Sequence, residues 1–403
     1  MYFVAYLDRV NAGFAALQMN AALGISDRAF GIGAGIFFIG YFLFEIPSNL
    51  ALVRVGARVW LARIAIVWGL VSITMLFVAG PRSFYVMRFL LGAAEAGFFP
   101  GVVLYFTYWF PGPDRARALA QFSTASMGAG IVGAPLSGLL LSLRGAAGLD
   151  GWQWLFLVEG LPAVALGLVA LWYLTDTPEV AAWLPEDEKA WLLDAIRRDR
   201  AAAPRPTAAT LTAGLVDPAV WVLAASLFLI VTSGYGFSFF LPQIVKAFSR
   251  ASDLAVGAWT AVPFLIAAVG MVVVATHSDR TGERRWHAAA SACLAAAGLA
   301  VASSSALPTA ARFASLSIAA VGLYAFTPPF WSLPTAFLRD DGAAAGIAFI
   351  NAVGNLGGFL GPFIMGWMKD ATGDYLIGLR LLAGAALTSA VTVLASRAAA
   401  GAR

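Results

Sequence analysis

Cysteine and histidine are scarce in this chain of 403 residues. The single cysteine, Cys293, excludes a disulfide framework or a thiolate metal site, because either needs several cysteines. The two histidines, His277 and His287, are too few for a metal centre. We therefore expect no metal and no cofactor. An enzyme is the class that the sequence favours least, because no phosphate-cradling loop and no nucleophile–base pair stands out.

Charge is also scarce, at 12% of residues, whereas a soluble domain is about a quarter charged. Apolar residues make up 60% of the chain, and apolar stretches of about 20 residues recur along its length. That length spans a bilayer core, so the sequence predicts an all-α integral membrane protein. The net charge of +4 needs no nucleic-acid partner, because the distribution of basic residues between loops explains it.

The apolar stretches predict twelve transmembrane helices. Their approximate ranges are 2–20, 30–52, 60–79, 83–109, 118–142, 153–174, 218–244, 254–276, 287–306, 311–337, 344–368 and 376–396. The longest polar stretch divides them into an N-terminal bundle of six (1–174), a linker (175–217) and a C-terminal bundle of six (218–403). Within the linker, WLPEDEKAWLLDAIRRD predicts an amphipathic surface helix, with acids in its first turn.

Basic residues indicate the orientation. If the N-terminus is cytoplasmic, 16 of the 26 Lys and Arg residues fall in cytoplasmic segments and 8 fall outside, with Arg9 and Arg88 in the membrane. This excess on one side predicts that both termini are cytoplasmic, in a bacterial-type inner membrane. Asp8 and Arg9 interrupt the first apolar run, and no basic segment precedes it, so we expect no cleavable signal peptide.

The two halves repeat. RVGARVW begins at Arg54 and RTGERRW at Arg280, and each follows the second helix of its half. GAP ends at Pro135 and GP at Pro362, so this second pair is separated by almost the same length of chain as the first. Two unrelated patterns with nearly the same offset favour duplication. Parallel six-helix halves are typical of transporters whose substrate site lies between the halves, near the middle of the membrane.

Four ionisable residues interrupt the apolar stretches of the first half. Asp8 and Arg9 lie in MYFVAYLDRVNAGFAALQM, and Arg88 and Glu95 lie in FYVMRFLLGAAEAGFFPGVVLYF. An ionised side chain at mid-bilayer costs roughly 2.5–3.5 kcal/mol, so such residues face one another or a hydrated cavity. Arg88 and Glu95 are about two helical turns apart and share a face, whereas the adjacent Asp8 and Arg9 point about 100° apart.

This quartet of charges suggests a way to couple two ligands. With both acids ionised, Asp8, Arg9, Arg88 and Glu95 sum to zero. Protonating Glu95 leaves one net positive charge, which an incoming carboxylate cancels, so proton and anion favour each other's binding. A structural ion pair between two helices is the alternative for the same residues.

Several segments resemble a known family. The loop HSDRTGERRWH, its counterpart LVRVGARVW, and the segments GIVGAPLSG and GNLGGFLGP resemble the major facilitator superfamily over nearly the full length. The first loop lacks the acid that the second has at Asp279. The segments YLDRVN, FFIGYFLFEIPSN, RFLLGAAEAGFFPG and INAVGNLGGFLGP resemble the anion:cation symporter branch, which includes proton-coupled carriers of sugar acids, tartrate and phthalate.

The resemblance implies roles for the quartet. Arg9 would contact the substrate carboxylate, Asp8 would pair with Arg88, and Glu95 would take the proton. Arginine suits the first task, because its planar fork binds a carboxylate through two hydrogen bonds. Tyr6 and Tyr41 are further substrate-binding candidates from the same resemblance. Glu45 is interpreted as a structural or gating residue, and Glu159 as a partner for backbone or neighbouring helices rather than a ligand.

The second half offers no ionisable residue deep in a span. Its candidate substrate-binding residues are amides and aromatics: Tyr235, Gln243, Trp331, Asn351 and Asn355. Asn351 and Asn355 share a helix face, because they lie at positions i and i+4. We expect the first half to supply charge and the second half to supply hydroxyl recognition. For each of these five candidate residues, the alternative is a role in packing alone.

The sequence predicts a secondary transporter that imports a small organic anion, such as a sugar acid, tartrate or an aromatic acid, with protons by alternating access. We expect it to act as a monomer. Three alternatives stay open: an organic-anion exchanger or uniporter without proton coupling, a drug efflux antiporter, and a membrane sensor that binds without transport.

Overall fold

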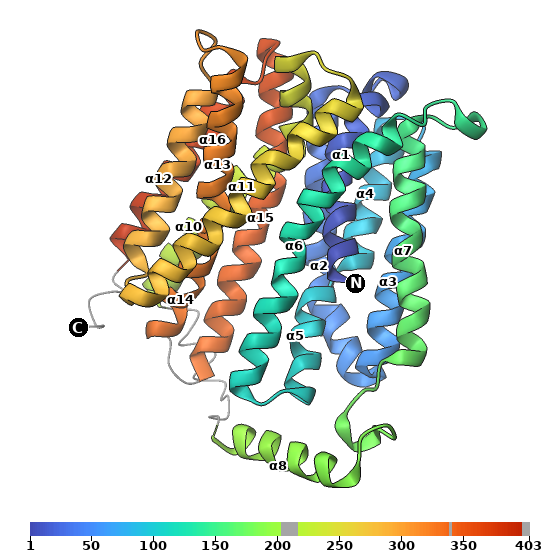
Figure 1. Cartoon of the computed structure of the whole chain (residues 1–403), viewed down its shortest axis with the longest axis vertical. Coiled ribbons are helices and arrows are strands. Elements are labelled where there is room, and N and C mark those ends of the chain that lie inside the picture. The colour runs from blue at the N-terminus through green and yellow to red at the C-terminus, as the bar shows by residue number, and fades with distance from the viewer. Residues whose placement is uncertain (203–216, 338–340, 397–403) are drawn as a thin grey trace.

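The computed structural model describes residues 1–202, 217–337 and 341–396, and every regular element in these ranges is a helix. The predicted all-α membrane fold is confirmed. By length and apolar composition, 10 segments qualify as membrane spans in the described residues, two of them formed by a pair of consecutive α-helices. The helices α1 (Tyr2–Leu23) and α12 (Arg285–Ala302) run beside these ten and complete the predicted twelve (Figure 1).

The remaining helices keep the predicted order along the chain. In the first half they are α2 (Asp27–Val55), α3 (Ala57–Thr74), α4 (Pro81–Glu95), α5 (Phe98–Trp109), α6 (Gly112–Leu141) and α7 (Gly151–Tyr173), and the linker contains α8 (Glu186–Ala202). In the second half they are α10 (Pro218–Ser249), α11 (Asp253–Thr281), α13 (Thr309–Ala325), α14 (Thr327–Phe337), α15 (Asp341–Thr372) and α16 (Leu376–Ala395). Short 3-10 turns lie at Met75–Phe77, Ala146–Gly148 and Pro178–Val180.

The duplication is visible in the helix starts. Ser26 caps α2 by accepting from the Ala29 amide, and Ser252 caps α11 by accepting from the Ala255 amide. Both helices have 29 residues, and an aspartate follows each cap. A serine N-cap satisfies a backbone N–H that the helix leaves free. The two serine caps are separated by the same length of chain as Arg54 and Arg280. The same N-cap therefore recurs in both halves at the spacing of the sequence repeat.

Two predicted spans are broken rather than continuous. The span predicted at 83–109 divides into α4 and α5 at Ala96 and Gly97, and Gly97 has a left-handed backbone (φ 83°). The span predicted at 311–337 divides into α13 and α14 at Phe326. Proline lacks the amide that would bond four residues back, so Pro100 and Pro329 weaken the helix at these points. The separation of these two prolines is again close to the offset of the repeat.

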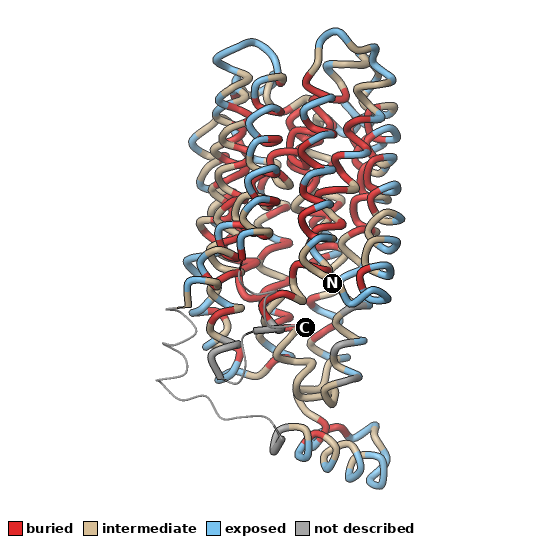
Figure 2. The backbone as a smooth tube through the Cα atoms, turned by 90° about the vertical axis from the view of Figure 1, so that its left-hand side faces the viewer, coloured by how far each residue is buried: buried red, intermediate tan, exposed pale blue. Residues whose placement is uncertain are grey.

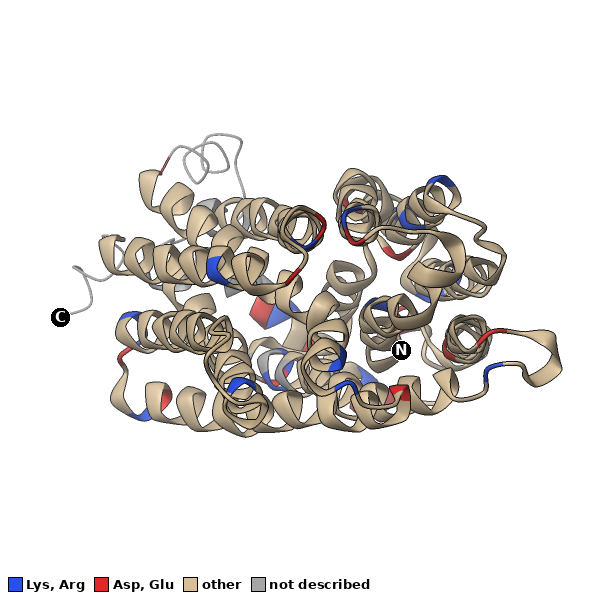
Figure 3. Ribbon diagram, turned by 90° about the horizontal axis from the view of Figure 1, so that it is seen from above, with Lys and Arg blue, Asp and Glu red and all other residues tan. Residues whose placement is uncertain are grey.

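The helices form two bundles, seen as two groups when the molecule is viewed from above (Figure 3). In the first, α3 packs on α7 and α2 on α4, and in the second, α10 packs on α15 and α16. The bundles contact each other most extensively through α2 with α15, α6 with α11, and α1 with α10. Two pseudo-symmetric six-helix bundles are thereby confirmed. Their exact boundaries stay a prediction, and part of the linker, residues 203–216, lies outside the described residues.

The bundles meet closely at the end opposite α8, which we name the far end. A Cβ at Gly31 of α2 would lie 2.3 Å from the Pro362 carbonyl oxygen of α15, and one at Gly138 of α6 would lie 3.0 Å from Gly257 Cα of α11. The Asp370 carboxylate also accepts the backbone amides of Asp27 and Arg28, each at 3.1 Å. Glycines therefore permit a backbone-to-backbone contact that seals this end.

At the other end, α8 lies below the first bundle, as the predicted surface helix (Figure 1). Trp183, before α8, stacks on Trp109 of α5 with ring centroids 5.7 Å apart. Nearby, Asp176 accepts the Arg58 backbone amide at 2.8 Å and so caps α3. An acid from the end of the first bundle thus occupies a position beside RVGARVW, the loop that lacks an acid of its own.

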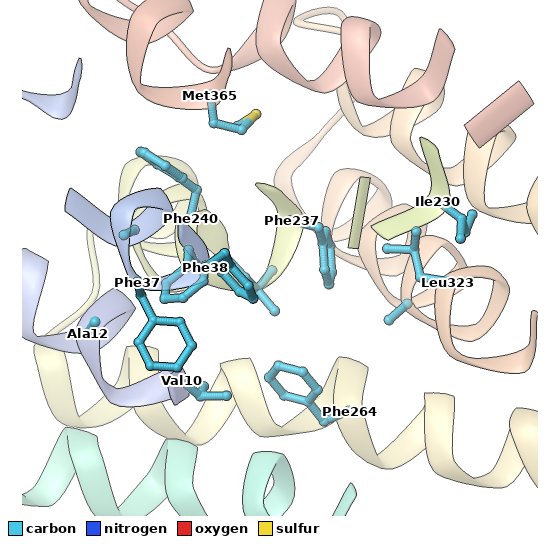
Figure 4. Packing of buried hydrophobic residues seen from close by; sticks show 14 of the residues in the cluster. Val10, Ala12, Phe37, Phe38, Ile230, Phe237, Phe240, Phe264, Leu323 and Met365 are labelled. Carbon is cyan, nitrogen blue, oxygen red and sulfur yellow. The ribbon is translucent and has the colours of Figure 1, made fainter. Parts of the chain in front are cut away.

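Buried residues run through the interior of both bundles, and exposed ones cover the loops and α8 (Figure 2). Where the bundles meet, aromatic rings from both fill the space: Phe37 and Phe38 of α2 lie near Val10 of α1 and near Phe240 of α10 (Figure 4). This aromatic layer surrounds the charged residues described next.

Candidate transport site

Glu95 is the last residue of α4, immediately before the helix break. The Ala96 amide still bonds to the Gly92 carbonyl, but Gly97 then turns the chain through its left-handed conformation. Ser48 of α2 occupies the space where a side chain at position 97 would lie, because a Cβ there would be 2.5 Å from its Oγ. Irregular backbone inside a membrane protein is tolerated only where protein or a wet cavity satisfies it. The break therefore fixes the position of the carboxylate.

Arg9 of α1 forms an ion pair with Glu95. Its Nε donates to Glu95 Oε1 at 2.8 Å, and its Nη2 contacts the same oxygen. The Glu95 side chain is 1% exposed, whereas the Arg9 side chain is 15% exposed. Glu95 Oε2 is buried without a hydrogen-bond partner. A buried charge of each sign therefore compensates the other, with one acceptor atom left over.

Asp8 does not form the ion pair with Arg88 that the resemblance implied. Asn11 Nδ2 donates to Asp8 Oδ1 at 3.1 Å, and Ser72 Oγ of α3 donates to the same atom. Asp8 points into its own bundle, toward α3, because it lies about 100° around the helix from Arg9. The expected arrangement, with Asp8 on Arg88 and Arg9 unpaired, is therefore corrected: Arg9 holds the ion pair and Asp8 has neutral donors.

Arg88 is fully buried, and its three guanidinium nitrogens have no hydrogen-bond partner. Its guanidinium carbon lies 5.1 Å from the ring centroid of Phe37 and 5.7 Å from that of Phe239, on α10 of the other bundle. Arg9 lies over the Phe37 ring as well, at 5.4 Å. Aromatic faces attract cations, but they accept no strong hydrogen bond. Arg88 thus keeps all its donors unused at the bundle interface.

The structure brings the quartet together but buries it more than expected. Asp8, Arg88 and Glu95 are at most 1% exposed, and only Arg9 keeps a measurable exposed fraction. From the sequence, these residues were expected to face one another or a hydrated cavity. In the described structure they lie together, and rings such as Phe37 and Phe239 cover the charges.

Three predicted tyrosines lie beside the quartet. Tyr41 is buried, and its ring centroid is 5.3 Å from the Arg9 guanidinium carbon. Tyr235 of α10 packs on Phe38, with ring centroids 4.4 Å apart. Tyr6 lies beside Tyr324 of α13, whose hydroxyl lies 3.4 Å from the Ser238 hydroxyl. Tyr6 and Tyr235 therefore lie at the contact between the bundles, and Tyr41 lies beside Arg9.

The other second-half candidates are placed differently. Gln243 lies about two turns beyond Tyr235 on α10, toward the far end, and its Oε1 accepts from the Tyr375 hydroxyl at 3.4 Å. Asn351 and Asn355 are half-buried on α15, and Asn355 precedes Gly358, which packs on Phe38. Trp331 is half-buried on α14 beside Phe330. The structure does not bring Gln243 or Trp331 into contact with the quartet.

The sequence analysis missed four neighbours of the quartet: Asn11, Ser72, Phe37 and Phe239. Asn11 could have been found, because it lies one helical turn after Asp8 on the same helix face. Ser72, Phe37 and Phe239 are common residue types in apolar spans and carry no local signal. Across the described residues, no group of three or more His, Cys, Asp or Glu side chains could hold a metal ion.

The model of the Major Facilitator Superfamily matches residues 1–362. The chain belongs to the major facilitator superfamily. A protein of Agrobacterium vitis named "Putative tartrate transporter" is 51% identical over 98% of this chain and 90% of its own length. A quinolone resistance transporter of Acinetobacter baumannii is 42% identical over 95% of this chain and 88% of its own length.

Solved structures of two other transporters have the same fold as this chain. A bacterial homolog of the human lysosomal transporter Spinster, inward-facing and occupied, superposes with a TM-score of 0.80 at 17% identity, over 98% of this chain and 94% of the other. The xylose transporter XylE of E. coli superposes with a TM-score of 0.74 at 14% identity, over 98% of this chain and 96% of the other. The protein is therefore a multi-pass membrane transporter of a small molecule, and the expectation that it is not an enzyme is confirmed by its family.

Proposed function

We propose that this transporter imports a small organic carboxylate together with protons, across a bacterial inner membrane. The observation that carries the proposal is the buried pair of Arg9 and Glu95 beside the unpaired Arg88. A deeply buried cation without an anion is costly, so a site with two arginines is suited to an anion. Relatives named as tartrate transporters support a hydroxylated dicarboxylate as the first substrate to test.

Glu95 and the substrate carboxylate would compete for one guanidinium. While Glu95 is ionised, its Oε1 occupies the Arg9 fork. A proton on Glu95 neutralises the carboxylate and weakens this pair, which frees Arg9 to bind the substrate through two hydrogen bonds. Each ligand then raises the affinity for the other by the same factor. That reciprocity is the thermodynamic requirement for symport.

Arg88 would supply the second positive charge. Its guanidinium carbon lies 5.1 Å from the Phe37 ring and 5.7 Å from the Phe239 ring of the other bundle, so its unused donors lie at the bundle interface. A monocarboxylate needs one arginine, and a dianion such as tartrate needs both. The half-buried amides of Asn351 and Asn355, with Tyr235, would recognise substrate hydroxyls from the second bundle.

Alternating access would rock residues 1–174 against 218–403, with 175–217 as the cytoplasmic connection. Both termini and α8 would lie in the cytoplasm, by the excess of basic residues on that side. The described conformation, sealed at the far end by α2–α15 and α6–α11 contacts, would then be closed toward the outside. One chain contains both bundles, so a monomer suffices.

Purified protein in liposomes provides the test. We expect an inward proton gradient to drive accumulation of radiolabelled tartrate, and a protonophore to abolish it. Glu95→Gln mimics the protonated acid, so it should lose accumulation but keep exchange of tartrate between the two sides. Glu186→Gln on α8, where the side chain is 88% exposed, is the matched control and should behave as wild type.

Uptake that is unchanged by the proton gradient would reject proton coupling and favour the exchanger or uniporter. One relative gives a second candidate, since a quinolone resistance transporter is 42% identical to this chain. Efflux of a quinolone would use the same arginines, because quinolones are carboxylic acids. Proton-driven export of norfloxacin from everted vesicles, without tartrate uptake, would favour that function.

A further inference from the structure

Glu159 is a second deeply buried carboxyl of the first bundle, and the proposed mechanism does not use it. It lies on α7 and is 1% exposed. Ser137 Oγ of α6 donates to its Oε1 at 3.0 Å, and Asn11 of α1 lies beside it. Asn11 Nδ2 donates to Asp8 Oδ1 at 3.1 Å, so this residue neighbours both carboxyl groups.

No cation compensates Glu159 among the described residues. The helix α7 packs on α1, α3, α6 and the turn at Met75–Phe77. From these elements, the titratable group that acts on Glu159 is Asp8, which carries the same sign of charge when ionised. Arg9 is occupied by Glu95, and Arg88 lies over Phe37 and Phe239. An ionised carboxylate buried without a counter-ion is strongly unfavourable, so the neutral acid is the stable form here.

Unpaired acceptors around Glu159 point to the same conclusion. Glu159 Oε2, Asn11 Oδ1 and Asp8 Oδ2 are all buried and lack a hydrogen-bond partner. Each of them accepts hydrogen bonds, so what the cluster lacks is a donor. Buried polar groups in native proteins are nearly always satisfied. A proton on Glu159 provides an O–H donor in the middle of these acceptors.

We propose that Glu159 is a proton-binding site, occupied in this conformation and adjacent to Asn11 and Asp8. The two arginines then face two ionised acids, Asp8 and Glu95, and the whole cluster of five ionisable groups is neutral. Loss of the Glu159 proton would leave the cluster with one net negative charge and weaken its attraction for an anion. The transport consequence rests on the proposed function, whereas the occupancy of the site does not.

Infrared spectroscopy of the purified protein tests occupancy without substrate or a proton gradient. The C=O stretch of a protonated acid is separate from the bands of carboxylates and backbone amides. At neutral pH, we expect one such band in the wild type, lost in Glu159→Gln and kept in Glu95→Gln. The control Glu186→Gln should also keep it. Failure of tartrate transport would leave this result unaffected.

A second variant, Ser137→Ala, tests the proposal even if Glu159→Gln does not fold. It removes the donor to Glu159 Oε1, so the same band should shift to higher frequency in an otherwise native chain. Absence of the band in the wild type, its retention in folded Glu159→Gln, or its loss in Glu95→Gln would each overturn the proposal. A band that does not move in Ser137→Ala would also contradict it.

Discussion

The two bundles share a fold but differ in what they bury. In the first, the buried polar residues include Asp8, Arg88, Glu95 and Glu159. In the described part of the second, the buried polar side chains are hydroxyls and one amide, Gln243. Duplication therefore gave two copies of one scaffold, and among the residues that the structure describes the buried charges lie in the first copy.

The two sets of polar groups also differ in how they are satisfied. In the second bundle, Ser226 and Ser389 exchange hydrogen bonds across α10 and α16, and Ser233 donates to the Leu382 carbonyl at 2.8 Å. In the first bundle, Arg88, Glu95 and their neighbours leave several buried atoms unpaired, and in the described part of the second bundle Gln243 Nε2 and Arg285 Nε are also unpaired. Unsatisfied groups are costly to keep, so the cluster around Arg88 and Glu95 marks the place where ligands would complete the structure. Satisfied hydroxyls indicate a structural role.

The largest expected effect comes from changing a first-bundle arginine without removing its charge. Arg9→Lys replaces the fork by a point charge that cannot form two parallel hydrogen bonds. We expect tartrate binding to weaken by about 30-fold or more, from a loss of roughly 2 kcal/mol. Calorimetry on purified protein measures it. Arg144→Lys, in a loop and 72% exposed, is the control. Near-normal affinity in Arg9→Lys would remove Arg9 from the site.

A smaller effect is expected where the bundles touch. Gly31→Ala places a Cβ 2.3 Å from the Pro362 carbonyl oxygen, and backbone cannot yield there as a side chain can. Closure at the far end should become unfavourable, and the tartrate uptake rate should fall by roughly tenfold, equivalent to about 1.4 kcal/mol. Gly384→Ala on α16 has nothing within 4 Å of the new Cβ and serves as the control. Equal uptake by both variants would contradict close packing at this end.

A matched pair of serine changes sharpens the contrast between the bundles. Ser389→Ala removes a buried pair of hydrogen bonds in the second bundle and should lower the free energy of unfolding by about 1–2 kcal/mol with tartrate affinity unchanged. Ser72→Ala removes a donor to Asp8 and should change the pH dependence of tartrate binding. Chemical denaturation and binding at several pH values measure both. The opposite result, in which Ser389→Ala changes the pH dependence of tartrate binding and Ser72→Ala changes only the free energy of unfolding, would contradict this difference between the bundles.

The smallest effect is expected at the exposed far-end contact. Asp370→Asn keeps the shape but removes a negative charge from the N-terminus of α2, where its oxygens accept two amides. Such a charge contributes about 0.3–1 kcal/mol when exposed. We expect the uptake rate to change by less than about fivefold. Asp374→Asn, in the adjacent loop, is the control, and a complete loss of transport in Asp370→Asn would show that the contact matters far more.

The fold was largely predictable from the sequence, because apolar length and the repeated Arg-x-Gly-x-Arg-x-Trp pattern depend on local chemistry. The break at Gly97 was missed, since hydropathy continues across it and only Pro100 signals it, whereas the Pro328–Pro329 pair indicates a bend beside Phe326. Residues sharing a face were predictable from helical spacing. The partners of Arg9 and Asp8 were not, because helix rotation is set by packing against other helices.

Proton uptake on binding tests the central claim most directly, that Glu95 and the substrate compete for Arg9. Calorimetric titration of tartrate in two buffers with different heats of ionisation gives the number of protons taken up per anion bound. We expect at least one proton in the wild type and one fewer in Glu95→Gln. Tartrate binding with no proton uptake, or equal uptake in both proteins, would contradict the account.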